Sequence, residues 1–347
     1  MASSLTSTAY YARRAIKYFA IGVVIYLILY IGWIISEPLR HREPPPLPIV
    51  PMFGGLPLPE FPEPDPNVVF SYRLETPSGG LPINFPDRTV VYQNRESRVG
   101  FFSLTNAVTL AKRYQFLEDA IPISPPIYHW KKVSGLPGLL EINTVTQDID
   151  LIYNWRLDPN LLISQKKTTN ESVYNIARSE LTKGGFWNKD IQNGDHKLIY
   201  FKIFHDQLLR VSSISEAELI QVNFRKAPIN KLPIVHADPE RPPIWVLVSR
   251  SGQAVEFHYR YYITGTQTSE YPILPVELAW QQLIQGKAYI AQIGSNIPGQ
   301  EIVIRDFSLA YYITNHYQPY TQAVYVIKGD NDFTAYVPAV NRTGTAK

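Results

Sequence analysis

The stretch LLEINTVTQDIDLIYNW, residues 139–155, decides the fold of this chain. Its second half places apolar or aromatic side chains at every other position, at Ile149, Leu151, Tyr153 and Trp155. A period of two with one polar face is typical of a half-buried antiparallel strand. A tight turn at Thr146-Gln147 separates this strand from the apolar run before it. The stretch therefore predicts two antiparallel strands joined by a hairpin turn.

The same pattern of a helix followed by strands recurs along the chain. Helices are predicted to begin at Ser103, at Thr168 and at Pro275, and the second has a capping-box spacing from Thr168 to Glu171 and a stop at Gly184-Gly185. Strands without strict alternation with helices indicate an α+β fold with antiparallel sheets. We expect tandem helix-plus-antiparallel-sheet modules at residues 68–160 and 161–340 and a disordered tail at 341–347. Predicted strands cover residues 89–92, 127–133, 139–145, 149–155, 197–204, 217–225, 244–250, 254–263, 287–293, 301–313, 321–328 and 333–338.

The segment YFAIGVVIYLILYIGWIIS, residues 18–36, contains no charged side chain. As a helix it spans roughly 28 Å, close to the thickness of a bilayer's hydrocarbon core. Tyr18, Tyr30 and Trp33 lie near its ends, where amphipathic rings favour the headgroup level. The apolar run is longer than that of a signal peptide, and no A-x-A-like cleavage site follows it. The sequence therefore predicts an uncleaved signal anchor that contacts the lipid bilayer.

The charges beside this segment predict its orientation. Arg13, Arg14 and Lys17 precede it, whereas Arg40 and Arg42 on the far side are mixed with acidic residues. The positive-inside rule then places residues 1–17 in the cytoplasm and the large C-terminal part outside the cell membrane, as in a single-pass protein.

A proline-rich segment follows, and eleven of the 29 residues from Pro38 to Pro66 are proline. Proline fixes φ and lacks an N–H donor, so the segment cannot form a helix or an interior strand. We expect residues 37–67 to be a stalk that acts as a spacer, and the alternative is a ligand for proline-binding domains.

Composition excludes several classes of function. The three cations before the anchor account for the net charge of +3, so the remaining chain carries 30 basic and 30 acidic side chains. A neutral body lacks the basic surface that nucleic acids require, so no nucleic-acid partner is expected. The chain contains no cysteine, which excludes disulfides, thiol nucleophiles and cysteine-based zinc sites.

No catalytic motif is recognisable in the sequence. There is no G-x-S-x-G elbow, P-loop or H-E-x-x-H helix, and the seven histidines show no metal-ligand spacing. Asp148 and Asp150 share one face of a strand, but Asp150 is opposite the apolar set and is expected to point to water. The sequence predicts no catalytic, cofactor-binding or metal-binding residue, and hence a protein that is not an enzyme and has no cofactor.

The segment 254–263 alternates along its whole length. Val255, Phe257, Tyr259, Tyr261 and Ile263 would face the core. The opposite face would carry Glu256, His258, Arg260 and Tyr262. This second face is either an ordinary solvated surface or a docking surface for a protein, because tyrosine and arginine are frequent at the centres of interfaces.

Two parts of the chain resemble known families. The predicted helix 104–117, with IYHWKK at 127–132 and LLEINTVTQDIDLIY at 139–153, resembles a PepSY-like module. The segments ELAWQQLIQGKAYI (277–290), EIVIRDFSLAYYI (301–313) and AVYVIKGDNDFTAYVPAV (323–340) resemble the extracytoplasmic YycH/YycI-type regulators. The overall layout is also similar to uncharacterised membrane-anchored proteins of candidate-phylum bacteria. The proline-rich segment departs from the regulators' pattern.

The resemblance implies a membrane-anchored, extracytoplasmic module that binds another envelope protein and regulates it, such as a sensor kinase or a peptidase. Two alternatives remain open from the sequence: a cell-envelope enzyme that acts on glycans, and a structural or adhesive surface protein.

The predicted orientation can be tested with a reporter enzyme fused after Lys347. We expect a reporter that works only outside the cytoplasm to be active, because the cations at residues 13–17 retain the N-terminus inside. Moving these three cations to the far side of the anchor should reverse the signal. Activity of a cytoplasm-only reporter at the same position would contradict the orientation.

Overall fold

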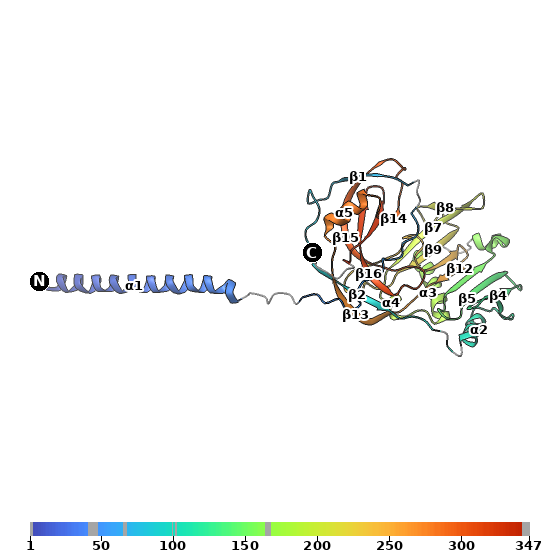
Figure 1. The fold of residues 1–347 in the computed structure, drawn as a ribbon, viewed down its shortest axis with the longest axis horizontal. Helices are drawn as coiled ribbons and strands as arrows, with labels where there is room; N and C mark the ends of the chain where they lie inside the picture. Colours follow the sequence, from blue (N-terminus) through green and yellow to red (C-terminus); the bar gives the residue numbers. More distant parts are fainter. Residues whose placement is uncertain are drawn as a thin grey trace. The chain divides into compact units, whose positions relative to one another are not determined.

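The computed structural model describes residues 3–40, 48–64, 68–98, 100, 103–163 and 168–341. It divides into two compact units, Met1–Pro48 and Ile49–Lys347, which we call the anchor unit and the body. The structure confirms an α+β chain with an N-terminal apolar helix and large sheets (Figure 1). Residues 41–47 and 65–67 of the predicted stalk, and 342–347 of the predicted tail, lie outside the described residues.

In its described part, the anchor unit contains the helix α1 (Ser3–Arg40), about 57 Å long. Its segment Ala9–Ile34 is long and apolar enough to cross a membrane, and its side chains are exposed. Arg13, Arg14 and Lys17 are on the same helix as the predicted span, and the guanidinium of Arg14 lies 3.4 Å from the hydroxyl oxygen of Tyr18. Near the other end, the rings of Tyr30 and Trp33 are 6.4 Å apart. The predicted single-pass segment is therefore part of a longer helix.

In the described part of the body, one sheet has nine strands, and all neighbouring strands are antiparallel. Its order is β3-β4-β5-β6-β12-β11-β9-β7-β8. The strands are β3 (Ile121–Ser124), β4 (Ile127–Lys132), β5 (Gly138–Asn143), β6 (Ile149–Tyr153), β7 (His196–Phe204), β8 (Gln207–Val211), β9 (Leu219–Phe224), β11 (Ile244–Ser249) and β12 (Ala254–Tyr259).

The second sheet has eight strands among the described residues, and it is built around a long strand, β15. β15 pairs with β16 on one edge, and on the other it pairs in parallel with β1 and β10. β16 continues to β17 and β14, and also pairs with β2, which pairs with β13. These strands are β1 (Ser71–Leu74), β2 (Arg88–Asn94), β10 (Ile234–Val235), β13 (Thr264–Pro272), β14 (Tyr289–Gln292), β15 (Glu301–Tyr312), β16 (Tyr320–Gly329) and β17 (Thr334–Pro338).

Helices cover these sheets through apolar faces. α2 (Ser103–Arg113) and α3 (Asn170–Gly184) share a buried core with one face of the nine-stranded sheet, and α5 (Val276–Ile284) packs on β17. The short elements are α4 (Lys189–Gln192), η1 (Trp155–Leu157) and η2 (Pro159–Leu162). α3 ends at Gly185, whose φ of 84° suits glycine, as the sequence predicts. Its capping box is formed by Thr169 and Ser172, not by the predicted Thr168 and Glu171, because the helix begins one residue later.

The chain crosses between the two sheets several times, so the body differs from the predicted modules at 68–160 and 161–340. β6 from the first range pairs with β12 from the second, and β2 pairs with β13. Both predicted ranges thus contribute strands to both sheets. The local pattern identifies a strand and its buried face, but it does not specify which distant strand will pair with its edge.

The second half of the predicted stalk also differs from the expectation, because residues 49–64 pack on the eight-stranded sheet. Leu56 is 6% exposed within the core of the eight-stranded sheet. The ring of Phe61 lies 5.3 Å from that of Tyr289 and 4.7 Å from that of Tyr312. The segment forms no strand, as its prolines dictate, and its apolar side chains are what attach it to the sheet.

The body also supplies hydrogen bonds to this segment. The hydroxyl of Tyr271 donates to the carbonyl of Gly54 at 2.8 Å, and the hydroxyl of Tyr312 donates to that of Glu60 at 3.1 Å. The side-chain amide of Gln322 donates to the carbonyl of Pro57 at 2.9 Å. A proline-rich chain has few N–H donors and many carbonyl acceptors, so donors from side chains of the sheet satisfy it.

Two leucines of this segment provide a direct test of its packing. Leu56→Ala should lower the free energy of unfolding of the body by about 2–4 kcal/mol, because it leaves a cavity in the core. Leu58→Ala is the matched control: Leu58 is 53% exposed, and its loss should change stability by less than about 0.5 kcal/mol. Urea unfolding of the full chain, followed by tryptophan fluorescence, measures both. Equal midpoints for the two variants would mean that the segment does not pack on the body.

Candidate functional site

Two hollows lie where the chain passes from β12 in one sheet to β13 in the other. They share Tyr261 and Tyr262, which belong to the connecting segment. Sites between packed layers are common ligand positions, because side chains from several elements converge there. We call the first the lysine pocket; it is lined by Phe224, Lys226, His236, Pro243, Ile244, Arg260, Tyr261, Tyr262 and Ile313. We call the second the tyrosine pocket; it is lined by Glu96, Ser97, Thr146, Asp148, Tyr261, Tyr262, Asn315, His316 and Tyr317.

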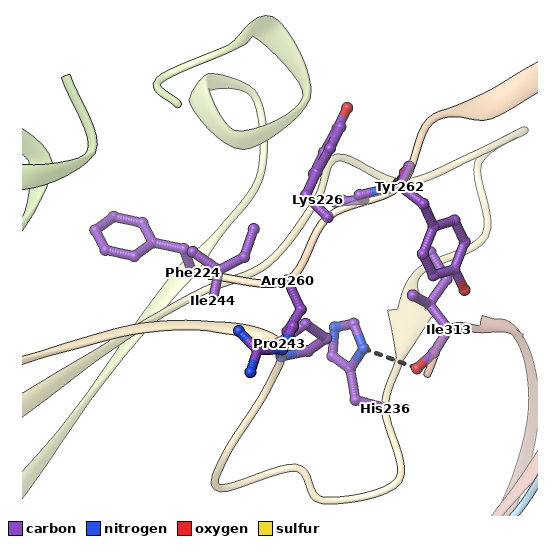
Figure 2. A pocket seen from close by; sticks show the side chains of 9 residues that line it. Phe224, Lys226, His236, Pro243, Ile244, Arg260, Tyr262 and Ile313 are labelled. Atoms are coloured by element: carbon purple, nitrogen blue, oxygen red, sulfur yellow. Dashed lines mark hydrogen bonds between the residues drawn. The ribbon is translucent and has the colours of Figure 1, made fainter. Parts of the chain in front are cut away.

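Lys226 occupies the lysine pocket and is 8% exposed (Figure 2). Its Nζ donates to the carbonyl oxygen of Tyr262 at 2.6 Å. The same nitrogen lies 4.0 Å from the ring centroid of Tyr261 and 5.2 Å from that of Tyr262. Burial lowers the pKa of Lys226 to about 8, although the charge of Asp190 acts in the opposite direction. The lysine is therefore an amine held between two aromatic rings, with a neutral fraction near pH 8.

His236 faces the same pocket and is 5% exposed. Its Nδ1 lies 3.1 Å from the carbonyl oxygen of Ile313, which makes Nδ1 the protonated nitrogen, because a carbonyl only accepts. Burial lowers the pKa of His236 to about 4, so the ring is neutral at physiological pH. Its Nε2 is buried without a hydrogen-bond partner among the described residues. The hollow contains about 10 Å³, which is room for about one water-sized molecule that donates to Nε2.

A row of charged side chains forms the wall next to this pocket. Asp150 on β6 is opposite His258 on β12, and its carboxylate pairs with both His258 and Arg260. Burial acts to raise the pKa of Asp150, but hydrogen bonds and charges from these two partners outweigh it and lower that pKa. The ring of Trp245 stacks on His258 at 5.6 Å. The charges of Asp150 and Arg260 thus neutralise each other, which allows both side chains to be half-buried.

Asp148 differs from Asp150 in its electrostatic surroundings. Burial raises the pKa of Asp148, and a hydrogen bond from Thr146 and the charge of Arg260 offset this only in part. The Nε of Arg260 is 3.9 Å from its carboxylate. Asp148 therefore presents a carboxyl group to the tyrosine pocket that holds its proton more tightly than an exposed aspartate. The sequence predicts that Asp150 points to water, and the structure instead pairs its carboxylate with His258 and Arg260.

The four residues of the predicted docking face are not side by side on an open surface. β12 ends at Tyr259, and the alternation in burial predicted for 254–263 holds as far as Arg260 and reverses at Tyr261 and Tyr262. Glu256 accepts a hydrogen bond from the indole of Trp155 at 3.0 Å, and His258 and Arg260 are paired with Asp150. Tyr262 is 8% exposed and lines both pockets.

Lys226 and His236 were not identified from the sequence. Lys226 lies in the segment RKAPIN, residues 225–230, which matches no motif, and His236 follows the short apolar run Pro233–Val235. The sequence did contain one signal for His236, which is that a single histidine directly follows apolar residues. Among the described residues, no group of three or more histidine, aspartate or glutamate side chains is placed to hold a metal ion.

Comparisons with known proteins found similar solved structures but no known family. No protein-family model and no curated protein matches the chain. Among solved structures, the chain is similar to an uncharacterized protein from Eubacterium rectale ATCC 33656, whose crystal structure was determined at 1.45 Å resolution. The two are 13% identical, the match covers 76% of this chain and 86% of that chain, and the TM-score is 0.35. Function must therefore be inferred from this chain's own residues.

Substitution of the buried lysine tests its electrostatic surroundings. The pKa of Lys226 is about 8 in the folded protein, whereas an ordinary lysine has a pKa of 10.5. Between these two pH values the unfolded chain binds more protons than the folded chain, so the stability of the wild type rises with pH. Lys226→Met removes this dependence. Relative to the variant, the wild type should gain about 3 kcal/mol between pH 7 and pH 10.5.

Urea unfolding of both proteins across this range gives the difference directly. The exposed Lys131, changed to Met, is the control and should give a curve parallel to that of the wild type. Parallel curves for wild type and Lys226→Met would contradict a lysine whose pKa is lowered by burial.

Proposed function

We propose that the protein is a single-pass membrane protein whose body lies outside the cytoplasm and binds another protein of the cell envelope. The proposal combines the apolar helix α1 with one feature of the body, the outer edge of β3. The PepSY-like and YycH/YycI-type resemblance extends the proposal to regulation of the bound protein, as of a sensor kinase or a peptidase.

The edge strand β3 is the observation that carries the proposal. It pairs with β4 on one side, and no strand in the described part of the chain pairs with its other side. All four of its residues are exposed, including Ile121 at 39% and Ile123 at 55%. Apart from Pro122, which has no N–H, the unpaired edge of β3 presents backbone N–H and C=O groups to which an extended segment of another protein can add as a further strand.

Apolar side chains extend this surface beyond the strand itself. Leu117 precedes β3 and is 76% exposed, and Val133 follows β4 and is 75% exposed. They lie at the end of the β3–β4 pair where Ile121 is opposite His129. Covering exposed apolar groups contributes roughly 25 cal/mol for each Å² removed from water, so a partner strand with apolar side chains would gain affinity here.

Site-specific photo-crosslinking in the native cells tests this proposal. A photoreactive residue at Ile123 should give a discrete adduct with one envelope protein, because a partner strand would lie alongside β3. The matched control is Ile297, which is 71% exposed elsewhere on the body and should give no such adduct. Leu117→Lys should remove the adduct from position 123 by placing a charge in the apolar contact.

The outcomes separate the protein partner from other ligands. Recovery of cell-wall glycan alone at position 123, or equal protein adducts from positions 123 and 297, would refute a specific protein partner at the β3 edge. Loss of the adduct when the anchor is replaced by a cleavable signal peptide would show that tethering supplies the local concentration that the contact needs.

A further inference from the structure

The tyrosine pocket is a second site, separate from the β3 edge. It is an open hollow lined by the chain after β2, the β5–β6 turn, the β12–β13 connection and the chain after β15. Its volume is about 150 Å³. A cavity of about this size holds one benzene ring, so the pocket has room for one six-membered ring of a ligand.

The lining combines aromatic surfaces with polar groups. The rings of Tyr262 and Tyr317 meet edge to face at 6.2 Å, with Tyr261 as a third ring. Burial raises the pKa of Tyr262 to about 12, so its hydroxyl stays protonated. The other lining side chains are all polar, and they include the carboxyl groups of Glu96 and Asp148. The ligand must therefore offer C–H surface to the rings and hydrogen-bonding groups to the polar side chains.

The polar groups are positioned by contacts of their own. The backbone N–H of Asp148 donates to the hydroxyl of Thr146 at 3.3 Å, and Arg260 is 3.9 Å from the Asp148 carboxylate. At the rim, the ring of His316 is 2.6 Å from the carboxylate of Glu60, and its carbonyl accepts from Thr314 at 2.5 Å. Such contacts hold the lining in place before a ligand arrives, which reduces the entropy lost on binding.

The charges restrict the class of ligand. The carboxyl groups of Glu96, Asp148 and the nearby Glu60 outnumber the one guanidinium close to them, that of Arg260, so phosphates and acidic sugars are disfavoured. A hydrocarbon ring would bury these carboxyl groups without hydrogen bonds, which costs free energy. A neutral sugar ring fits both requirements, because its hydroxyls donate to carboxylates while its C–H faces pack on tyrosine rings.

We propose that the tyrosine pocket binds one pyranose ring of a neutral glycan. This goes beyond the proposed protein partner, and the two sites share no residue, so either proposal can fail alone. Sugar binding and the crosslink at Ile123 are separate measurements.

The test uses the full chain in nanodiscs prepared without glycoside detergents, whose sugar headgroups would compete. Neutral tetrasaccharides built from glucose, mannose and N-acetylglucosamine are titrated and followed by calorimetry. At least one should bind with a Kd below about 1 mM. Tyr317→Ala should weaken it at least about tenfold through the lost ring contact, and Glu96→Gln, on an exposed residue, should weaken it several-fold.

Two controls separate the pocket from general surface effects. Tyr128→Ala changes a half-buried tyrosine on β4, and Ile123→Lys changes the β3 edge; neither should alter sugar affinity. Tetralysine tests a basic peptide as the alternative occupant.

Three results would overturn the assignment. The first is that no neutral tetrasaccharide binds at concentrations up to about 10 mM. The second is that a sugar binds, but with the same affinity in the wild type, Tyr317→Ala and Glu96→Gln. The third is that no sugar binds, whereas tetralysine binds and both variants weaken its binding.

Discussion

The pairing of β6 with β12 holds the nine-stranded sheet together as one unit. It joins the β3–β6 strands to β7–β9 and β11, which are far away in sequence. On one face it brings Leu151 and Phe257 into the core under the helices, and on the other it places Asp150 opposite His258. The charged row, the position of Arg260 and the start of the connection that lines both pockets all depend on this register.

Buried tyrosine hydroxyls connect strands of the eight-stranded sheet to the segments that pack beside them. Tyr271 and Tyr312 donate to carbonyls of the proline-rich segment, Tyr311 donates to the carbonyl of Val90 and Tyr325 to that of Leu274. A buried ring supplies apolar area, while its hydroxyl satisfies a carbonyl that would otherwise lack a donor, a net contribution of about 1 kcal/mol for each bond. In a chain with 23 tyrosines and no cysteine, these contacts hold long segments in place where other proteins use disulfides.

Local features of the fold could be predicted, and long-range ones could not. The hairpin at Thr146-Gln147, the helix stop at Gly185 and the strand beginning at Glu301 follow from patterns within a few residues. The packing of residues 49–64 depends on tyrosines more than 200 positions away, and proline content alone does not reveal it. The lysine pocket was missed for the same reason. The burial and hydrogen bonds that distinguish Lys226 and His236 come from Tyr262 and Ile313, which are distant in sequence.

The interleaved topology has a consequence for synthesis. β2, near residue 90, pairs with β13 and with β16, which begins at Tyr320. At about 5–20 residues per second, roughly 10–45 s pass between the synthesis of β2 and that of its last partner. During this interval the apolar face of β2 has no sheet to join, and such distant pairings slow folding. The early strands must therefore stay soluble until the C-terminal strands have been synthesised.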